Sequence, residues 1–171
     1  MTTEIGPARV EYRSEKHYMG IRVQTPFDGM FAVVEQLRKE LFKWFKAQGI
    51  TPQGPAFLRY HVIDMAGEMD IEFGVQVAEA LPGDQRVRAG VLPAGQYAML
   101  IYKGLGLQSN KALLNWVKDN GITLDRWDDP KGDVFACRYE SYLTDPKIEP
   151  RKKKWDIELT FKIADQHPNA H

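Results

Sequence analysis

Three short segments occur twice in this chain, in the same order each time. They are GIT at residues 49–51 and 121–123, RY at 59–60 and 138–139, and DIE at 70–72 and 156–158. The spacing between copies grows at each step, as expected if the second copy has the longer loops. An ordered internal repeat predicts a duplicated structural unit. We therefore expect one domain over residues 1–171, built from two pseudo-symmetric halves at about 5–80 and 84–164.

Each half is predicted to contain two strands, a helix and two more strands. In the first half the helix is expected over about residues 26–48, with Thr25 as its N-cap and Pro26 in its first turn. Gly49 follows, where a left-handed residue is favoured. The expected strands lie at residues 8–13, 17–24, 56–63 and 69–78. Apolar positions in the helix recur every three or four residues and predict one buried stripe, namely Met30, Val33, Val34, Leu37, Leu41, Trp44 and Phe45.

The second half follows the same plan, with a shorter helix expected over about residues 109–120. Its strands are expected at residues 86–93, 96–104, 134–143 and 154–163. Because half-sheets of this size are marginal alone, they should join into one antiparallel sheet with both helices on one face. The predicted fold class is α+β, with a central groove between the helices, where small-molecule sites often form. The tail at 165–171 is expected to be disordered.

The charge balance argues against nucleic acid as a direct partner. Lys plus Arg equals Asp plus Glu, at 23 each, whereas phosphate binding requires a basic excess. The one basic run, residues 151–154, is interpreted as a solvated loop. No apolar segment is long enough to cross a membrane, and the first residues do not resemble a signal peptide. The single cysteine, Cys137, fits a cytoplasmic protein and is interpreted as a buried apolar residue rather than a nucleophile.

No metal or cofactor site is predicted. The four histidines, at positions 17, 61, 167 and 171, lack the spacing of metal ligands. The glycines of residues 103–106 lack the spacing of a nucleotide-binding loop, and this segment is interpreted as a connector. Glu72 and Glu158 occupy the same place in the two DIE segments, and we assign them structural or rim roles.

The segment CRYESYLTDP, residues 137–146, places a carboxylate within an aromatic strand. Glu140 lies between Tyr139 and Tyr142, and aligning the two RY segments matches Glu140 with His61. Strand alternation then predicts which residues share one face of the sheet. The residues expected to line the groove are Glu140, Tyr142, Phe57 and His61, with Trp116 and Tyr102 as further walls.

A buried Glu140 requires a partner, because an unpaired carboxylate in an apolar site is unfavourable. The partner is either an internal cation, for which Arg138 and Arg59 are candidates, or a positively charged ligand. Aromatic rings around a cation contribute roughly 0.5–2 kcal/mol each. A solvated position at the edge of a strand is the alternative for Glu140, and His61 alone is more typical of a hydrogen-bonded strand histidine than of a ligand-binding residue.

The chain resembles the GyrI-like small-molecule-binding domains. The resemblance extends over about residues 5–164 and is carried by the repeat, by Pro93-Ala94-Gly95-Gln96-Tyr97, and by Glu140-Ser141-Tyr142 with Asp145-Pro146 after it. It implies a free-standing form of the effector-binding domain of BmrR-type regulators, in which a central groove binds diverse lipophilic aromatic compounds, often cationic ones. It also implies that Glu140 is the acidic residue of the pocket. The aromatic lining then falls on Tyr60, Tyr142, Trp116 and Tyr102, although alternation puts Tyr60 on the opposite face from Glu140 unless a bulge intervenes.

The resemblance leaves two other functions open. Some relatives resemble hydrolases that open cyclopropane rings of DNA-alkylating compounds, for which Glu140 would be the general base and Tyr60 a proton donor. The link of the family name to gyrase inhibition suggests the other function, an inhibitor that interacts with gyrase. The expected partners are therefore hydrophobic aromatic or cationic small molecules, with a protein partner as a further possibility.

Overall fold

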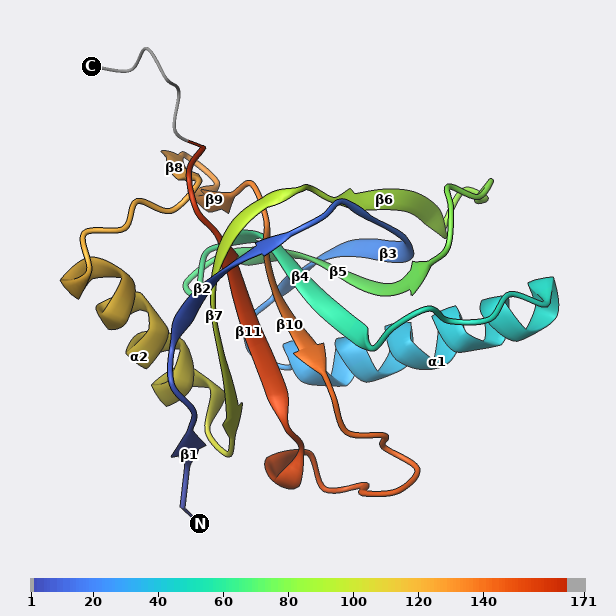
Figure 1. Ribbon diagram of the computed structural model, residues 1–171. Coiled ribbons are helices and arrows are strands. Elements are labelled where there is room, and N and C mark those ends of the chain that lie inside the picture. Colours follow the sequence, from blue (N-terminus) through green and yellow to red (C-terminus); the bar gives the residue numbers. More distant parts are fainter. Residues whose placement is uncertain (1, 166–171) are drawn as a thin grey trace.

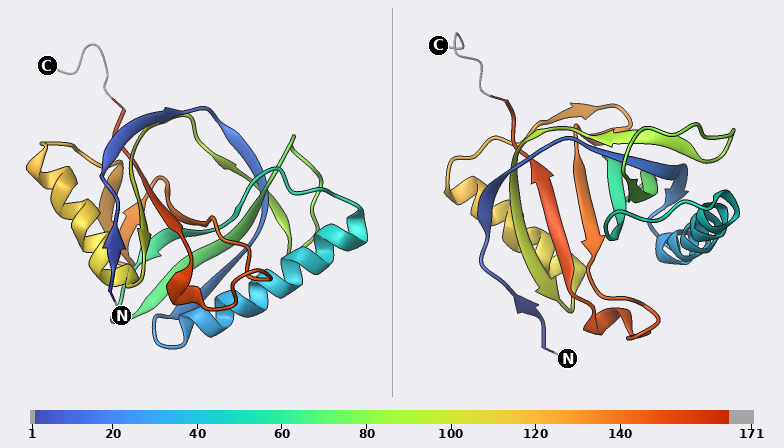
Figure 2. Two further views of the ribbon diagram at one scale, coloured as in Figure 1. Left: turned by 60° about the horizontal axis from the view of Figure 1, so that its bottom comes forward. Right: turned by 45° about the vertical axis from the view of Figure 1, so that its right-hand side comes forward.

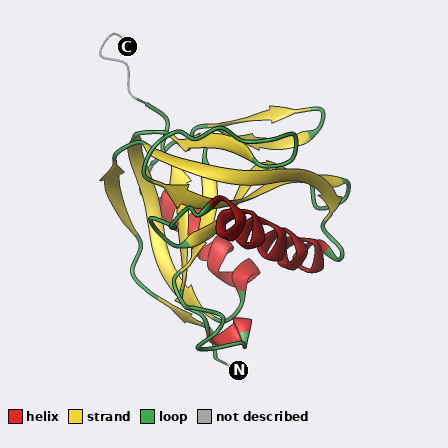
Figure 3. Cartoon of the chain, turned by 90° about the vertical axis from the view of Figure 1, so that its right-hand side faces the viewer, coloured by secondary structure: helices red, strands yellow, loops and turns green. Residues whose placement is uncertain are grey.

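The computed structural model describes residues 2–165, which form two helices and an antiparallel sheet of eleven strands (Figure 1; Figure 3). The strands are β1 (Glu4–Ile5), β2 (Arg9–Arg13), β3 (Lys16–Pro26), β4 (Ala56–Ile63), β5 (Glu68–Val77), β6 (Arg88–Leu92), β7 (Gly95–Lys103), β8 (Arg126–Asp129), β9 (Gly132–Phe135), β10 (Arg138–Tyr142) and β11 (Ile157–Lys162). The helices are α1 (Met30–Gln48) and α2 (Gly106–Asp119), with a short 3-10 turn η1 (Lys152–Lys154). The α+β class and the single antiparallel sheet are confirmed.

The strand order runs β1-β7-β11-β10-β4-β5-β3-β6, with β2 also paired to β7. Strands β4 and β10, one from each predicted half, are neighbours at the centre. On one side of this pair the order continues β5, β3, β6, and on the other side β11, β7, β2. Two related halves would produce such an order, and the duplication remains an inference from the sequence repeat.

The sheet is strongly curved because β2 and β3, which follow each other along the chain, pair with β7 near one end of the strand order and with β6 at the other. β2 lies against β7 and β3 lies against β6, and the register continues from one pair to the next: Arg13 is opposite Gly95, and Lys16 is opposite Leu92. Figure 2 shows the strands bending round in this way, with both helices outside the curve.

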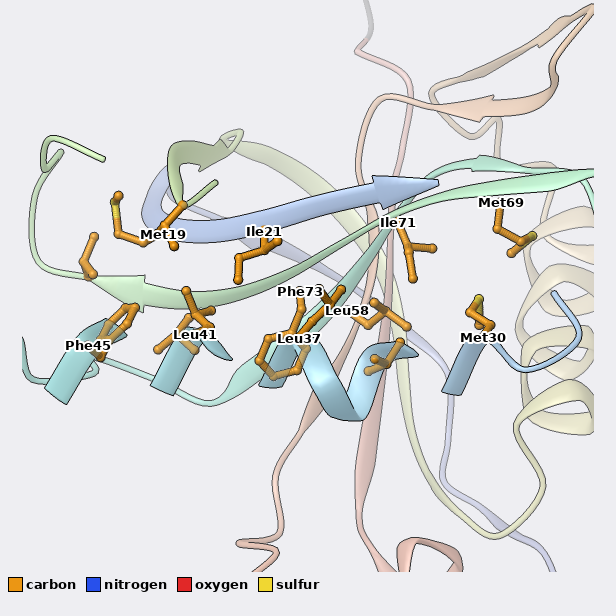
Figure 4. Close-up of a cluster of buried hydrophobic side chains, with 14 residues drawn as sticks. Met19, Ile21, Met30, Leu37, Leu41, Phe45, Leu58, Met69, Ile71 and Phe73 are labelled. Atoms are coloured by element: carbon orange, nitrogen blue, oxygen red, sulfur yellow. The ribbon is translucent and has the colours of Figure 1, made fainter. Parts of the chain in front are cut away.

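Both helices cover the same face of the sheet, as predicted, and we call it the helix face. The stripe of α1 that includes Leu37, Leu41 and Phe45 packs on Ile21 and Phe73 (Figure 4). α2 packs in the same manner on β7 and β11. Each fully buried side chain of this size contributes roughly 1.5–3 kcal/mol to folding. These two layers therefore hold the helices at fixed positions over the sheet.

The first helix begins later than expected. Strand β3 stays paired with β5 as far as Pro26, which lies opposite Glu68, so Thr25 is a strand residue and the predicted N-cap is wrong. A turn follows, and Gly29 adopts the left-handed conformation (φ 79°) before Met30 starts the helix. The predicted end is confirmed, because Gly49 is left-handed (φ 67°) and its N–H bonds to the carbonyl of Lys46.

The predicted strand at 134–143 is in fact two strands. β9 ends at Phe135 and forms a hairpin with β8, whereas β10 begins at Arg138 in the central sheet. Cys137 lies between them and is buried, as predicted, and its burial raises the pKa of the thiol. Of the tail predicted at 165–171, residues 166–171 lie outside the described residues, and Asp165 forms an ion pair with Lys162 at 3.0 Å. No helix within residues 2–165 is long and apolar enough to cross a membrane.

Candidate functional site

A cavity of about 650 Å³ lies on the helix face, and we call it the helix-side cavity. It is bounded by the starts of α1 and α2, the central strands and η1. Its volume is typical of small-molecule sites. The lining residues are Phe27, Phe31, Tyr60, Ile63, Met65, Met69, Tyr102, Gly104, Leu105, Gly106, Leu107, Gln108, Asn110, Arg138, Glu140, Lys152, Lys153 and Ile157.

Glu140 is the one acidic residue in this lining, and only 3% of it is exposed. Strand pairing places it between Leu58 of β4 and Leu159 of β11, in the middle of the sheet. Its two carboxylate oxygens accept hydrogen bonds from different tyrosines. The Tyr60 hydroxyl donates to Oε1 at 2.7 Å, and the Tyr142 hydroxyl donates to Oε2 at 2.8 Å.

No ion pair to Glu140 occurs within residues 2–165, although Arg138 and Arg59 were candidate partners. Arg138 donates instead to the side chain of Asn110 (2.8 Å), and Arg59 lies on the opposite face of the sheet. Burial, followed by the nearby charge of Glu140, raises the pKa of the Tyr60 and Tyr142 hydroxyls well above the usual range. The hydroxyls therefore remain neutral donors, which stabilise the carboxylate without neutralising it.

The cross-strand register places Glu140 on the helix face, as predicted, and corrects which residues of β4 share that face. Because Glu140 pairs with Leu58, the even-numbered residues of β4 share its face up to Tyr60. Tyr60 therefore reaches Glu140 directly, and the bulge in β4 follows only after this residue. The alignment of the RY segments placed the two strands one residue out of phase, and such a slip moves every side chain to the other face. The matching of Glu140 with His61 was wrong for this reason.

Phe57 and His61 accordingly lie on the opposite face and do not line the helix-side cavity. Phe57 packs edge-on against Tyr139, with ring centroids 5.5 Å apart. The His61 Nε2 lies 2.8 Å from Oε1 of Glu72. The ligand-binding assignments of both residues are therefore inconsistent with the cavity that contains Glu140.

The remaining predicted aromatics differ in their relation to the cavity. Tyr60 and Tyr102 line it, whereas Tyr142 lies behind Glu140 and packs against Trp155 with ring centroids 5.8 Å apart. Trp116 is half-buried and packs on the α2 core, nearly three turns beyond the start of the helix, and it does not line the cavity. The lining residues of α2 all lie between Gly106 and Asn110.

Sequence reasoning missed the mouth of the cavity. Four large apolar side chains of the lining are also exposed: Phe31, Met65, Leu105 and Leu107. They come from three separate segments, and an exposed apolar cluster of this kind often marks a binding site. The ammonium of Lys152 lies over the ring of Phe31, 3.4 Å from its centroid. Phe31 is a large apolar residue outside the buried stripe of α1. This position is the one feature of the sequence that indicates its role at the cavity mouth.

The opposite face carries two further cavities, of about 340 and 860 Å³. The larger is lined by the polar network of Glu72, Tyr18, His61 and Arg59. Hydrogen bonds from His61 and Tyr18 lower the pKa of Glu72, although burial alone would raise it. Glu72 is thus satisfied internally, as its predicted structural role requires. No group of three or more potential metal ligands occurs in the part of the chain that the structure describes.

The family model for GyrI-like small-molecule-binding domains matches residues 7–164. This chain belongs to the GyrI-like family. No curated protein matches the GyrI-like chain in a sequence comparison. Its membership therefore rests on the family model and is consistent with the fold of solved structures.

The GyrI-like domain is similar to the C-terminal domain of EcmrR, at 22% identity and a TM-score of 0.73, with 94% of this chain and 99% of that domain covered. It spans 58% of the EcmrR chain in an EcmrR–DNA complex. A hydrolase from Listeria innocua matches at 11% identity and a TM-score of 0.61, covering 92% of this chain and 91% of that one. SAV2435 bound to tetraphenylphosphonium matches at 10% identity and a TM-score of 0.57, covering 96% and 99%. These similarities establish a shared fold.

Proposed function

We propose that this GyrI-like domain binds flat, lipophilic aromatic cations in the helix-side cavity, with Glu140 as the residue that recognises positive charge. The observation that carries the proposal is the burial of Glu140 together with the nature of its hydrogen-bond partners. Its carboxylate is buried at the wall of a cavity, and its hydrogen bonds come from two neutral tyrosine hydroxyls. A buried charge is most favourable when an opposite charge faces it. A cationic ligand supplies that charge.

The aromatic lining supports the same class of ligand. Cations bind over the faces of aromatic rings with roughly 0.5–2 kcal/mol per contact. Phe31, at the mouth, already holds the ammonium of Lys152 in this geometry. Tyr60 and Tyr102 extend the aromatic surface inward toward Glu140. A flat aromatic cation would thus meet rings along its length and an acid at its end.

The similarity to SAV2435 also supports the proposal, because the solved structure of that protein is bound to tetraphenylphosphonium, which is a lipophilic aromatic cation. Low sequence identity means that the residues of its site are not transferred to this chain. What supports the proposal is that the shared fold is compatible with ligands of this class.

A cationic rhodamine dye, followed by fluorescence polarisation, tests the function. We expect the Glu140→Gln variant to bind the dye about tenfold more weakly than wild type, because a hydrogen-bonded charge is lost. A neutral dye of the same shape should bind the two proteins equally. The matched control is Glu72→Gln, which removes a buried acid from the opposite face and should not alter dye binding. Equal dye affinity of wild type and Glu140→Gln would contradict the proposal.

A hydrolytic function is a second candidate, favoured by the 2.7 Å hydrogen bond between Tyr60 and Glu140. The water oxygen would bond to one ring carbon as the strained C–C bond breaks, while Glu140 accepts a proton from the water and Tyr60 protonates the leaving carbon; Glu140 would then return the proton to Tyr60 along their hydrogen bond. Incubation with a cyclopropane-containing alkylating compound, followed by mass spectrometry, tests this. A product heavier by one water supports hydrolysis, whereas binding without turnover contradicts it.

A further inference from the structure

Arg138 is a buried cation on the wall of the same cavity, and it is 8% exposed. It lies two residues before Glu140 on β10, so both side chains point to the helix face. Its guanidinium is held between two rings, with Cζ 4.7 Å from the centroid of Phe135 and 4.2 Å from that of Phe161. This stacking fixes the orientation of the guanidinium plane.

Most N–H donors of the Arg138 guanidinium have no hydrogen-bond acceptor within residues 2–165. Of its five N–H groups, one donates to Oδ1 of Asn110 at 2.8 Å, and Nε is buried without a partner. Asn110 is itself fixed, because its Nδ2 donates to the carbonyl of Gly106 in the first turn of α2. Within residues 2–165, no carboxylate forms an ion pair with Arg138. Its pKa is lowered to about 10 by burial, despite the nearby Tyr60, Asp133 and Glu140.

Arg59 makes more hydrogen bonds than Arg138, although the Nε of each arginine is buried without a partner within residues 2–165. Arg59 occupies the same place in the other RY segment, but it faces the opposite side and donates three hydrogen bonds. These go to the Tyr18 hydroxyl and to two backbone carbonyls. Arg138 makes one such bond in a more buried position. The difference indicates that the unused donors of Arg138 are available to something in the cavity.

The other charged residues of the lining also favour a ligand that carries an acceptor group. Lys152 and Lys153 line the cavity along with Arg138, whereas Glu140 is the one acid. A ligand with positive charge alone would meet one acid and three cations. A ligand that also carries an acceptor group would satisfy Glu140 at one end and Arg138 at the other. Two residues along a strand span about 7 Å, which is the length of a small fused ring system.

We propose that Arg138, positioned by Asn110, is a second polar anchor that binds a carboxylate on an amphoteric aromatic ligand, whose cationic part faces Glu140. This inference rests on the proposed function and specifies its ligand class. Arginine suits the role because its planar fork matches a carboxylate. Lipophilic cations without an acceptor bind the same cavity but leave this anchor unused.

Rhodamine B and its ethyl ester test the second anchor, because they differ only in whether the carboxylate is free. Titrated by fluorescence polarisation at neutral pH, wild type should bind the free acid about tenfold more tightly than the ester. In Arg138→Met the two affinities should become equal. Methionine fits between the two rings and removes a buried charge that makes no ion pair within residues 2–165, so the variant should fold. Arg88→Met, an exposed arginine of the opposite face, controls for net charge and should keep the preference.

A second variant tests the anchor without removing it. Asn110→Asp puts a carboxylate against Arg138 and should abolish the preference for the free acid while the ester still binds. If wild type binds both dyes equally, or if Arg138→Met keeps the preference, the second anchor is refuted and aromatic-cation binding stands. If neither dye binds wild type, the proposed function and the anchor are both refuted.

Discussion

Two buried glutamates lie on opposite faces of one sheet, and their surroundings differ. Glu72 receives hydrogen bonds from Tyr18 and from His61, which can carry a positive charge, and Arg59 lies nearby. Within residues 2–165, Glu140 receives side-chain hydrogen bonds only from Tyr60 and Tyr142. The first acid is thus part of a closed network, whereas the second makes no ion pair within residues 2–165 and lies at the edge of a cavity. The comparison teaches that burial by itself does not mark a binding site, and that the nature of the partners does.

Alkaline unfolding should not distinguish the two faces, because tyrosine hydroxyls support both acids. Burial raises the pKa of six tyrosines, at positions 18, 60, 97, 102, 139 and 142. Above pH ~10 the unfolded chain loses these protons first, so folding stability should fall as pH rises, by on the order of 1.4 kcal/mol per tyrosine per pH unit. Urea unfolding at pH 9 and pH 11 measures this loss.

Tyrosinate absorbance adds a control to the alkaline experiment. The six buried tyrosines should ionise together with unfolding and not before it. Ionisation of most of them in the folded protein would show that the hydroxyls around both glutamates are accessible, and the comparison would lose its basis.

Stability measurements at neutral pH should separate the two acids. Glu72→Gln breaks a buried charged network and should reduce the free energy of unfolding by about 3 kcal/mol. Glu140→Gln removes a charge that makes no ion pair within residues 2–165 and keeps an acceptor for one tyrosine, so its effect should stay within about 1 kcal/mol. Equal losses in the two variants, measured by urea unfolding, would mean that Glu140 is as fully compensated as Glu72.

The smallest expected effect concerns the internal cation at the cavity mouth. Lys152 occupies the face of Phe31, so a cationic dye must displace it to use that ring. Lys152→Met should raise the affinity for a cationic rhodamine about threefold, in line with an exposed cation–π contact. Lys154→Met is the control, because Lys154 belongs to the same turn but does not line the cavity. An equal change in both variants would reflect net charge and not the contact with Phe31.

The sequence predicted the elements well because their patterns are strong. The stripe from Met30 to Phe45 has a helical period, and Gly49 ends the helix as such a residue should. The single antiparallel sheet and the common helix face followed from the assumption of two related halves, whereas the strand order was not predicted. The start of α1 was missed because pairing with β5 extends β3 to Pro26. Such pairing between distant segments cannot be predicted from the residues next to Pro26.

The candidate site was predicted only in part. Glu140 and the aromatic character of its strand were apparent, but the face of each residue was not, because β10 is buried on both sides and lacks apolar–polar alternation. The two RY segments are therefore not equivalent in the structure. Arg138 faces the helix-side cavity, whereas Arg59 faces the opposite side of the sheet. Phe31 and Lys152 reach the cavity from distant segments, and only the packing of α1 and η1 brings them together.

The most direct test of the central claim is a crystal structure of the domain with a cationic rhodamine bound. The account predicts that the dye lies in the helix-side cavity, with its charged nitrogen toward the carboxylate of Glu140 and its rings against Tyr60 and Tyr102. A dye bound on the opposite face, or bound in the cavity with its charge directed away from Glu140, would contradict it.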